Sequence, residues 1–268
     1  MNKPLHDTQI QIWLFLAFAV SFAIKVPLFP FHTWLPDAHV QAPTAGSVVL
    51  AAVLLKMGTY GFLRFAIPLF PHATEIFMPA LATLAVIGIV YGAMLAFVQH
   101  DIKKLVAYSS ISHLGVVVLG IASLTIESLT GSVYQMLGHG VTTGALFILI
   151  GMIYERRHTR ELSEFGGLAK QLPVYAVCFV IIVLGSAGVP GFVGFIGEFL
   201  ILSGSFLAPS SIQVFEHFSY FSLLSAISVS GVILSAVYLL KLVQKMFFGP
   251  LSQEKNQNLV DLSFREKR

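Results

Sequence analysis

Long apolar runs separated by short polar segments dominate the chain of 268 residues. About 20 consecutive apolar residues are enough for a helix to cross a bilayer, and the pattern predicts about seven such spans, the first and the sixth interrupted. Their expected positions are 9–29, 45–67, 75–98, 103–123, 129–153, 173–206 and 217–247. We therefore expect an all-α polytopic membrane protein, with one transmembrane domain over residues 1–250 and a cytoplasmic tail over 251–268.

Prolines and glycines mark the two interruptions. Pro27 and Pro30 follow Lys25 in the first span, and each proline removes a backbone donor and frees the carbonyl four residues earlier. The sixth span carries a glycine at every third position from 185 to 197, with Pro190 among them, and Glu198 follows immediately. Irregular backbone at membrane depth is tolerated only where protein or water satisfies it, so both breaks should border a polar region.

Ionisable side chains lie inside the apolar runs. Lys56 is near the middle of its span, where a charge costs about 2.5 to 3.5 kcal/mol on insertion scales unless it faces protein or water. Lys25, His113, His139 and Glu198 repeat this placement, which indicates a polar path. Structural roles remain open at this point, because a buried lysine can pair with an acid and a lone histidine can serve as a hydrogen-bonded core residue. The spacing of the histidines predicts no metal site.

The charge pattern indicates how the chain lies in the membrane. Hydrophobic residues make up 56% of the sequence and charged residues 11%, which excludes an ordinary soluble domain. Most basic residues lie at alternate span ends, and the positive-inside rule makes those ends cytoplasmic, with the N-terminus outside. The formal charge of +3 therefore needs no nucleic-acid partner. These basic residues are Lys103, Lys104, Arg156, Arg157, Arg160, Lys170, Lys241, Lys245, Lys255, Arg265, Lys267 and Arg268.

Three segments resemble a known family. They are KVPLFPFHTWLPDAH over 25–39, APTAGS over 42–47 and LLKMGTYG over 54–61, and they are similar to the antiporter-like membrane subunits of respiratory complex I. Multisubunit cation/proton antiporters and membrane-bound hydrogenases share this core. Gly197-Glu198-Phe199 resembles the subunit class called chain M in bacteria and chain 4 in mitochondria, because the other classes usually carry lysine in that broken helix.

The resemblance implies a role for each of these side chains. Lys25 would be the lysine of the first broken helix, Lys56 the central lysine, and Glu198 the terminal acid of the second broken helix. The remaining relay members would be His32, His113 and His139, on a hydrated axis that joins them. Redox energy released elsewhere would drive protons outward along this axis.

The resemblance also implies the surroundings of the chain. No cofactor would bind here; NADH, FMN, iron–sulfur clusters and quinone would belong to partner subunits. The expected partners are other membrane subunits of complex I, above all neighbouring antiporter-like subunits, together with the lipid bilayer and protons. The expected location is the bacterial inner membrane.

Three alternatives to this interpretation remain open, and the chain differs from the family in its number of spans. The chain could belong to a Na⁺/H⁺ antiporter, to a membrane-bound hydrogenase, or to a non-pumping structural subunit. Sodium would want a cluster of oxygen ligands, and Glu198 and Asp37 are the acids expected near the midplane. Family members have about twice as many spans, so the resemblance implies a C-terminal-half fragment or one of several separate chains. The acidic partner of Lys25 would then lie in the other half.

Overall fold

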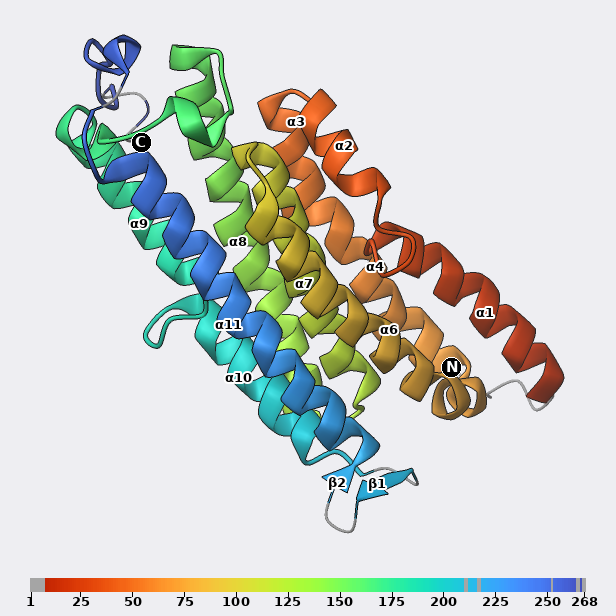
Figure 1. Ribbon diagram of the computed structural model, residues 1–268. Coiled ribbons are helices and arrows are strands. Elements are labelled where there is room, and N and C mark those ends of the chain that lie inside the picture. Colours follow the sequence, from red (N-terminus) through yellow and green to blue (C-terminus); the bar gives the residue numbers. More distant parts are fainter. Residues whose placement is uncertain (1–7, 210–211, 216–217, 252, 264–265, 267–268) are drawn as a thin grey trace.

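The computed structural model describes residues 8–209, 212–215, 218–251, 253–263 and 266, almost all of them helical. Figure 1 shows the long helices side by side in one tilted bundle. The helices are α1 (Thr8–Lys25), α2 (Trp34–Gln41), α3 (Thr44–Val49), α4 (Leu55–Gly61), α5 (Ile67–Leu69), α6 (Pro71–Val98), α7 (Ile102–Ala122), α8 (Ile126–Arg157), α9 (Pro173–Ser186), α10 (Val193–Phe206) and α11 (Tyr220–Phe247).

These helices confirm the predicted all-α membrane fold. Among the described residues, six helical stretches are long and apolar enough to cross a membrane, namely α1, the continuous run Thr44–Leu69, α6, α7, α8 and α11. The remaining predicted span consists of the two shorter apolar helices α9 and α10. Because α9 and α10 each contain 14 residues, they are too short to cross singly and form one interrupted span together.

The helix α7 lies at the centre of the bundle. In its apolar window 94% of the residues are buried, and Figure 1 places it between α6 and α8, with α1 at one edge and α9 to α11 at the other. The N-cap Asp101 accepts hydrogen bonds from the backbone N–H groups of Lys103 and Lys104, which satisfies two of the four free donors at a helix start. The central helix therefore has neighbours on all sides.

Both predicted interruptions are present. The first follows Lys25, where α1 ends, and the chain turns before the short helix α2. The backbone N–H of Leu28 donates to the carbonyl of Ala23 at 2.8 Å, so a carbonyl that Pro27 was expected to free has a protein partner. The second interruption separates α9 from α10 at residues 187–192, where Gly188 has φ +68° and Gly191 has φ +94°.

The second span contains two π-helical turns. They occupy Leu50–Leu54 and Phe62–Ala66, on either side of α4. A π-helical turn inserts an extra residue and changes which side chains share a face. Lys56 is the second residue after the first of these turns, and its side chain donates to the carbonyl of Ala51 within that turn.

Both ends of the bundle carry small additional elements. At one end β1 (Gln213–Phe215) pairs antiparallel with β2 (Phe218–Ser219). At the other end the segment after α11 returns to the bundle, where the Asp261 carboxylate accepts hydrogen bonds from the backbone N–H groups of Val174 and Tyr175 at 2.8 and 3.1 Å. Three 3-10 turns complete the fold, at Leu162–Glu164, Leu168–Lys170 and Glu254–Asn256.

Candidate functional site

Lys56 on α4 is in direct contact with His139 on α8. The Lys56 ammonium Nζ lies 2.7 Å from His139 Nδ1 and donates to the carbonyl of Ala51 at 2.5 Å. No carboxylate of the described residues forms an ion pair with Lys56. The structure therefore pairs the central lysine with a histidine, a group that can itself take up a proton.

His113 on α7 contacts Glu198, which begins the second turn of α10. His113 Nδ1 lies 3.0 Å from Glu198 Oε1, and both side chains are buried, at 3% and 4% exposure. The amide of Gln135 on α8 donates to the same Oε1 at 3.2 Å. Since buried charge is tolerated only when it is paired and hydrogen-bonded, this carboxylate has the partners that its burial requires.

The two histidine rings join these pairs into one array. Their centroids are 5.6 Å apart, and the Nε2 atoms of His113 and His139 are buried without a hydrogen-bond partner in the described part of the chain. With Lys56 as an ammonium and His139 neutral, His139 Nδ1 accepts from Lys56 and the ring proton is on Nε2. With Glu198 as a carboxylate and His113 neutral, His113 Nδ1 donates to Glu198 and its Nε2 is bare. In these protonation states one Nε2 is a donor and the other an acceptor, and neither has a partner among the described residues.

Glycines bring the backbones close enough for these contacts. At Gly188 a Cβ atom would lie 2.5 Å from Glu198 Oε2, and its positive φ disfavours any side chain. At Gly140 a Cβ atom would lie 3.0 Å from the carbonyl oxygen of Ala52, so the glycine lets α8 approach the π-helical turn before Lys56. Both glycines adjoin the array directly.

The two other predicted site residues lie outside these contacts. Lys25 is exposed at the last position of α1. His32 is buried in the turn after α1, where its ring stacks on Phe29 at 5.6 Å and meets the edge of Tyr91 at 5.5 Å. The structure thus brings Lys56, His139, His113 and Glu198 together, and the proposed roles of Lys25 and His32 are not part of that array.

Two polar side chains near the array were not predicted from the sequence. His39 on α2 is fully buried, neither ring nitrogen has a partner in the described part of the chain, and its ring stacks on Phe147 at 4.5 Å. It lies within electrostatic range of Lys56 and Lys103. Lys103, expected as a loop anchor, is only 7% exposed. His39 follows His32 by seven residues, about two helical turns. This spacing was the feature of the sequence that could have indicated His39 as a further site residue.

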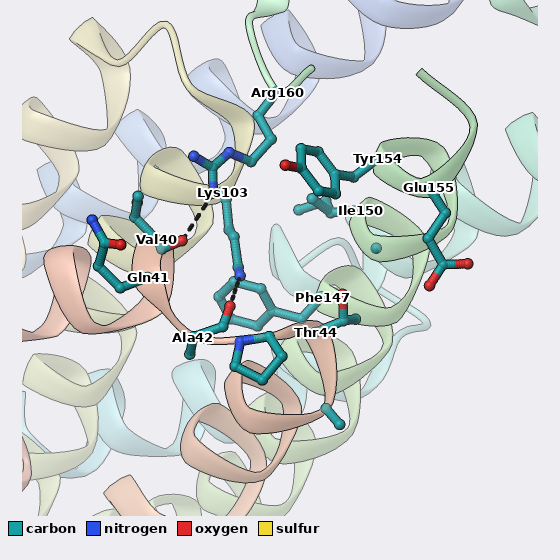
Figure 2. A pocket seen from close by; sticks show the side chains of 13 residues that line it. Val40, Gln41, Ala42, Thr44, Lys103, Phe147, Ile150, Tyr154, Glu155 and Arg160 are labelled. Carbon is teal, nitrogen blue, oxygen red and sulfur yellow. Dashed lines mark hydrogen bonds between the residues drawn. The ribbon is translucent and has the colours of Figure 1, made fainter. Parts of the chain in front are cut away.

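A cavity of about 620 Å³ with Lys103, Glu155 and Arg160 in its wall opens beside this region. Figure 2 shows Lys103 and Arg160 directed at the connection between α2 and α3, where they donate to the carbonyls of Ala42 and Val40 at 2.7 and 2.9 Å. Phe147, the stacking partner of His39, also lines this cavity. The cavity therefore reaches from the polar end of the bundle to the ring that covers His39.

The fold and the site together define a class of protein. It is a polytopic helical membrane protein with a row of buried ionisable side chains that extends to a broken helix. The sequence profile of the NADH:quinone oxidoreductase/Mrp antiporter transmembrane family matches residues 2–228. The chain belongs to this family.

Individual relatives agree with the family assignment. The chain is 48% identical to NADH-quinone oxidoreductase subunit M of Rhodobacter capsulatus, over 96% of this chain and 48% of that protein. A chain of respiratory complex I from Thermus thermophilus is 39% identical and superimposes with a TM-score of 0.88, over 98% of this chain and 53% of that one. The resemblance to subunit M is thereby confirmed, and the chain spans about half the length of the curated relatives it matches.

A more distant neighbour shares the fold. A chain of the Mrp complex from Dietzia sp. DQ12-45-1b superimposes with a TM-score of 0.83 at 24% identity, over 92% of this chain and 44% of that one. At this identity the similarity concerns the architecture alone. The bundle with its broken helices is therefore common to both branches named in the family description.

Proposed function

We propose that this chain relays protons within the membrane arm of an NADH:quinone oxidoreductase, as an antiporter-like subunit of the subunit M class. The observation that carries the proposal is the contact series from Lys56 through His139 and His113 to Glu198. Each member of this series can gain and lose a proton, and each is positioned by a different helix. A row of ionisable groups inside a membrane is the usual mark of a proton relay.

The geometry provides a route for the proton. Lys56 would give a proton to His139 Nδ1, and His113 would give its Nδ1 proton to Glu198. Because the two Nε2 atoms are not hydrogen-bonded to each other, the proton of His139 Nε2 would reach the bare Nε2 of His113 through an intervening water. The transfer converts an ammonium and a carboxylate into two neutral groups, so a charge pair appears and disappears at the two ends of the array. The rings must then return to their first tautomers before another proton can pass.

The energy needed is modest. Moving one charge against about 100 mV requires about 2.3 kcal/mol, and one pKa unit corresponds to about 1.36 kcal/mol. A change of less than two pKa units between the ends of the array is enough. A redox-driven rearrangement in partner subunits would supply that change, with NADH, FMN, iron–sulfur clusters and quinone bound there, and Lys25 would act as an electrostatic switch at the first break.

We further propose the orientation that the basic residues favour. The end of the bundle with Lys103, Arg156 and Arg160 would face the cytoplasm, and the N-terminus would face outward. In that orientation the cavity of Figure 2 would admit water from the cytoplasmic side towards His39 and Lys56. His32 would contribute to hydration at the first break.

Substitution of the two end members in the assembled complex tests the proposal. We expect Lys56→Met and Glu198→Gln to abolish proton translocation through this subunit while the complex still assembles, measured as proton uptake per NADH oxidised in sealed vesicles. Unchanged pumping with normal assembly would sink the relay and favour a structural subunit. A requirement for sodium would favour the antiporter, although the described residues contain no group of three or more His, Cys, Asp or Glu side chains that could hold a metal ion.

A further inference from the structure

Two lysines near the end of α11 lack the carboxylate partner that four other basic residues at this end of the bundle have. There, four basic residues have carboxylate partners: Lys104 with Asp37, Arg156 with Glu266, Arg157 with Glu164 and Arg160 with Asp101. In contrast, Lys241 and Lys245 form no ion pair with any described carboxylate. They are four residues apart on one helix face, an arrangement in which like charges destabilise a helix.

These lysines border two adjoining cavities. One cavity, of about 240 Å³, lies between the ends of α6 and α11 and is lined by Gln99, His100, Lys241 and Lys245. The other, of about 710 Å³, continues from it over Phe97 and Lys241 to the outer surface of α11. No carboxylate lines either of them. The surroundings thus favour a negatively charged occupant.

The wall beyond the charges is apolar and faces outward. Phe97, Val237 and Leu240 are 37%, 45% and 50% exposed, and the Lys241 ammonium lies 4.0 Å from the centroid of the Phe97 ring. Basic pockets between transmembrane helices at the cytoplasmic boundary bind anionic lipid headgroups. The combination of two cations without a carboxylate partner and an adjoining apolar surface fits one molecule that is charged at one end and apolar at the other.

We propose that Lys241 and Lys245 bind the phosphate headgroup of an anionic phospholipid, with an acyl chain lying along Phe97, Val237 and Leu240. This binding is independent of the proton relay. It gives α6 and α11, which pack against each other in the bundle, a common lipid ligand at the membrane boundary.

The test measures lipid binding to the full chain. Delipidated protein in detergent is titrated with dioleoylphosphatidylglycerol or dioleoylphosphatidylcholine, and bound lipid is counted by native mass spectrometry. At about five-fold per lysine near the surface, we expect the double variant Lys241→Gln/Lys245→Gln to weaken phosphatidylglycerol binding about thirty-fold and to leave phosphatidylcholine binding unchanged. Lys255→Gln, at an exposed lysine of the tail, is the matched control and should change neither.

Two further measurements keep the result decisive. If the double variant does not fold, Lys245→Gln alone should still weaken phosphatidylglycerol binding about five-fold, because Lys245 is exposed. A phosphatidylglycerol with a photoreactive acyl chain should crosslink to the α11 residues 237–245. Undiminished phosphatidylglycerol binding, an equal loss for both lipids, or crosslinks confined to other helices would overturn the proposal.

Discussion

His113 and His139 lie with their ring centroids 5.6 Å apart, and in both rings the buried Nε2 atom lacks a hydrogen-bond partner among the described residues. Their Nδ1 atoms are both engaged, one by Glu198 and one by Lys56. With Lys56 charged, Glu198 ionised and both histidines neutral, one Nε2 carries a proton and the other can accept it. In the proposed relay, the interval between the rings is the step that connects the two halves of the array.

The ring pair leads to a prediction for His139. We expect His139→Gln to retain a polar contact with Lys56 but to stop proton passage, because an amide does not accept and release a proton near neutral pH. Since positioned proton-transfer groups contribute about 10²-fold or more, proton translocation coupled to NADH oxidation should fall by at least about that factor. The matched control is His72→Gln in the first turn of α6, where the side chain is exposed; an equal loss in the control would contradict the assignment.

Gly188 predicts a position-specific cost. Gly188→Ala places a Cβ atom in the left-handed region, at about 1 to 2 kcal/mol, and also 2.5 Å from Glu198 Oε2. Gly191→Ala has the same kind of backbone strain at φ +94° but meets nothing within 4 Å. We expect a larger drop in Tm for Gly188→Ala, measured by thermal unfolding in detergent, together with loss of proton translocation. Equal effects of the two variants would mean that the contact with Glu198 adds nothing to the drop in Tm or to the loss of proton translocation.

The approach of α8 to Lys56 yields a second glycine comparison. In Gly140→Ala the new methyl group would lie 3.0 Å from the Ala52 carbonyl oxygen, whereas in Gly144→Ala it would lie 3.5 Å from the Ala52 side chain, an ordinary contact. We expect Gly140→Ala to push α8 outward by a few tenths of an ångström, which lengthens the hydrogen bond between Lys56 and His139. Proton translocation should decrease in Gly140→Ala and remain near normal in Gly144→Ala; the reverse order would be inconsistent with the packing described here.

The tail provides a pH-dependent contact outside the membrane spans. Hydrogen bonds from the backbone and hydroxyl of Ser263, and then from Arg156, lower the pKa of Glu266 to about 2, from an ordinary value of 4.5. A carboxyl with a depressed pKa stabilises the docked state above its ordinary pKa, and this stabilisation is lost as the pH falls from about 4.5 towards 2. The Arg156–Glu266 contact should therefore persist at neutral pH and weaken in acid.

A spin label at the exposed position Asn258 would report this change as increased mobility below about pH 4. In Glu266→Gln the carboxyl that titrates is absent, so the label should be more mobile at neutral pH and should respond little to acid. If the mobility of the label increased in acid with the same pH midpoint in both proteins, the transition would belong to a different group.

The sequence was sufficient for the members of the array but not for their connections. Lys56 and Glu198 stand out because a charge within an apolar run is costly wherever the helix packs. The contact between Lys56 and His139 joins positions 83 residues apart, and its existence depends on the glycine at 140 and on a π-helical turn that no local pattern announced. Gln135 escaped prediction because an amide within a span carries no charge penalty, although it lies four residues before His139 on the same face.

The burial of Lys103 was not predicted from the sequence. Its position beside Lys104 at a span end is typical of a solvated basic residue, but the structure buries Lys103 and leaves Lys104 partly exposed. Lys104 contacts Asp37 from an exposed position, whereas Lys103 turns inward to the carbonyl of Ala42. The two lysines are consecutive in α7, so their side chains point in different directions. The packing of α2 against α7 decides which of them is buried.

The break between α9 and α10 separates the helix that carries Glu198 from the helix before it. Glu198 is carried by a short helix that is joined to its neighbour through two glycines with positive φ, while His113 is held in the central and most enclosed helix of the bundle. A hydrogen bond of 3.0 Å is lost once its atoms separate beyond about 3.5 Å. In the proposed relay, a shift of α10 by less than the width of one atom would therefore break the last contact of the array and stop proton transfer to Glu198.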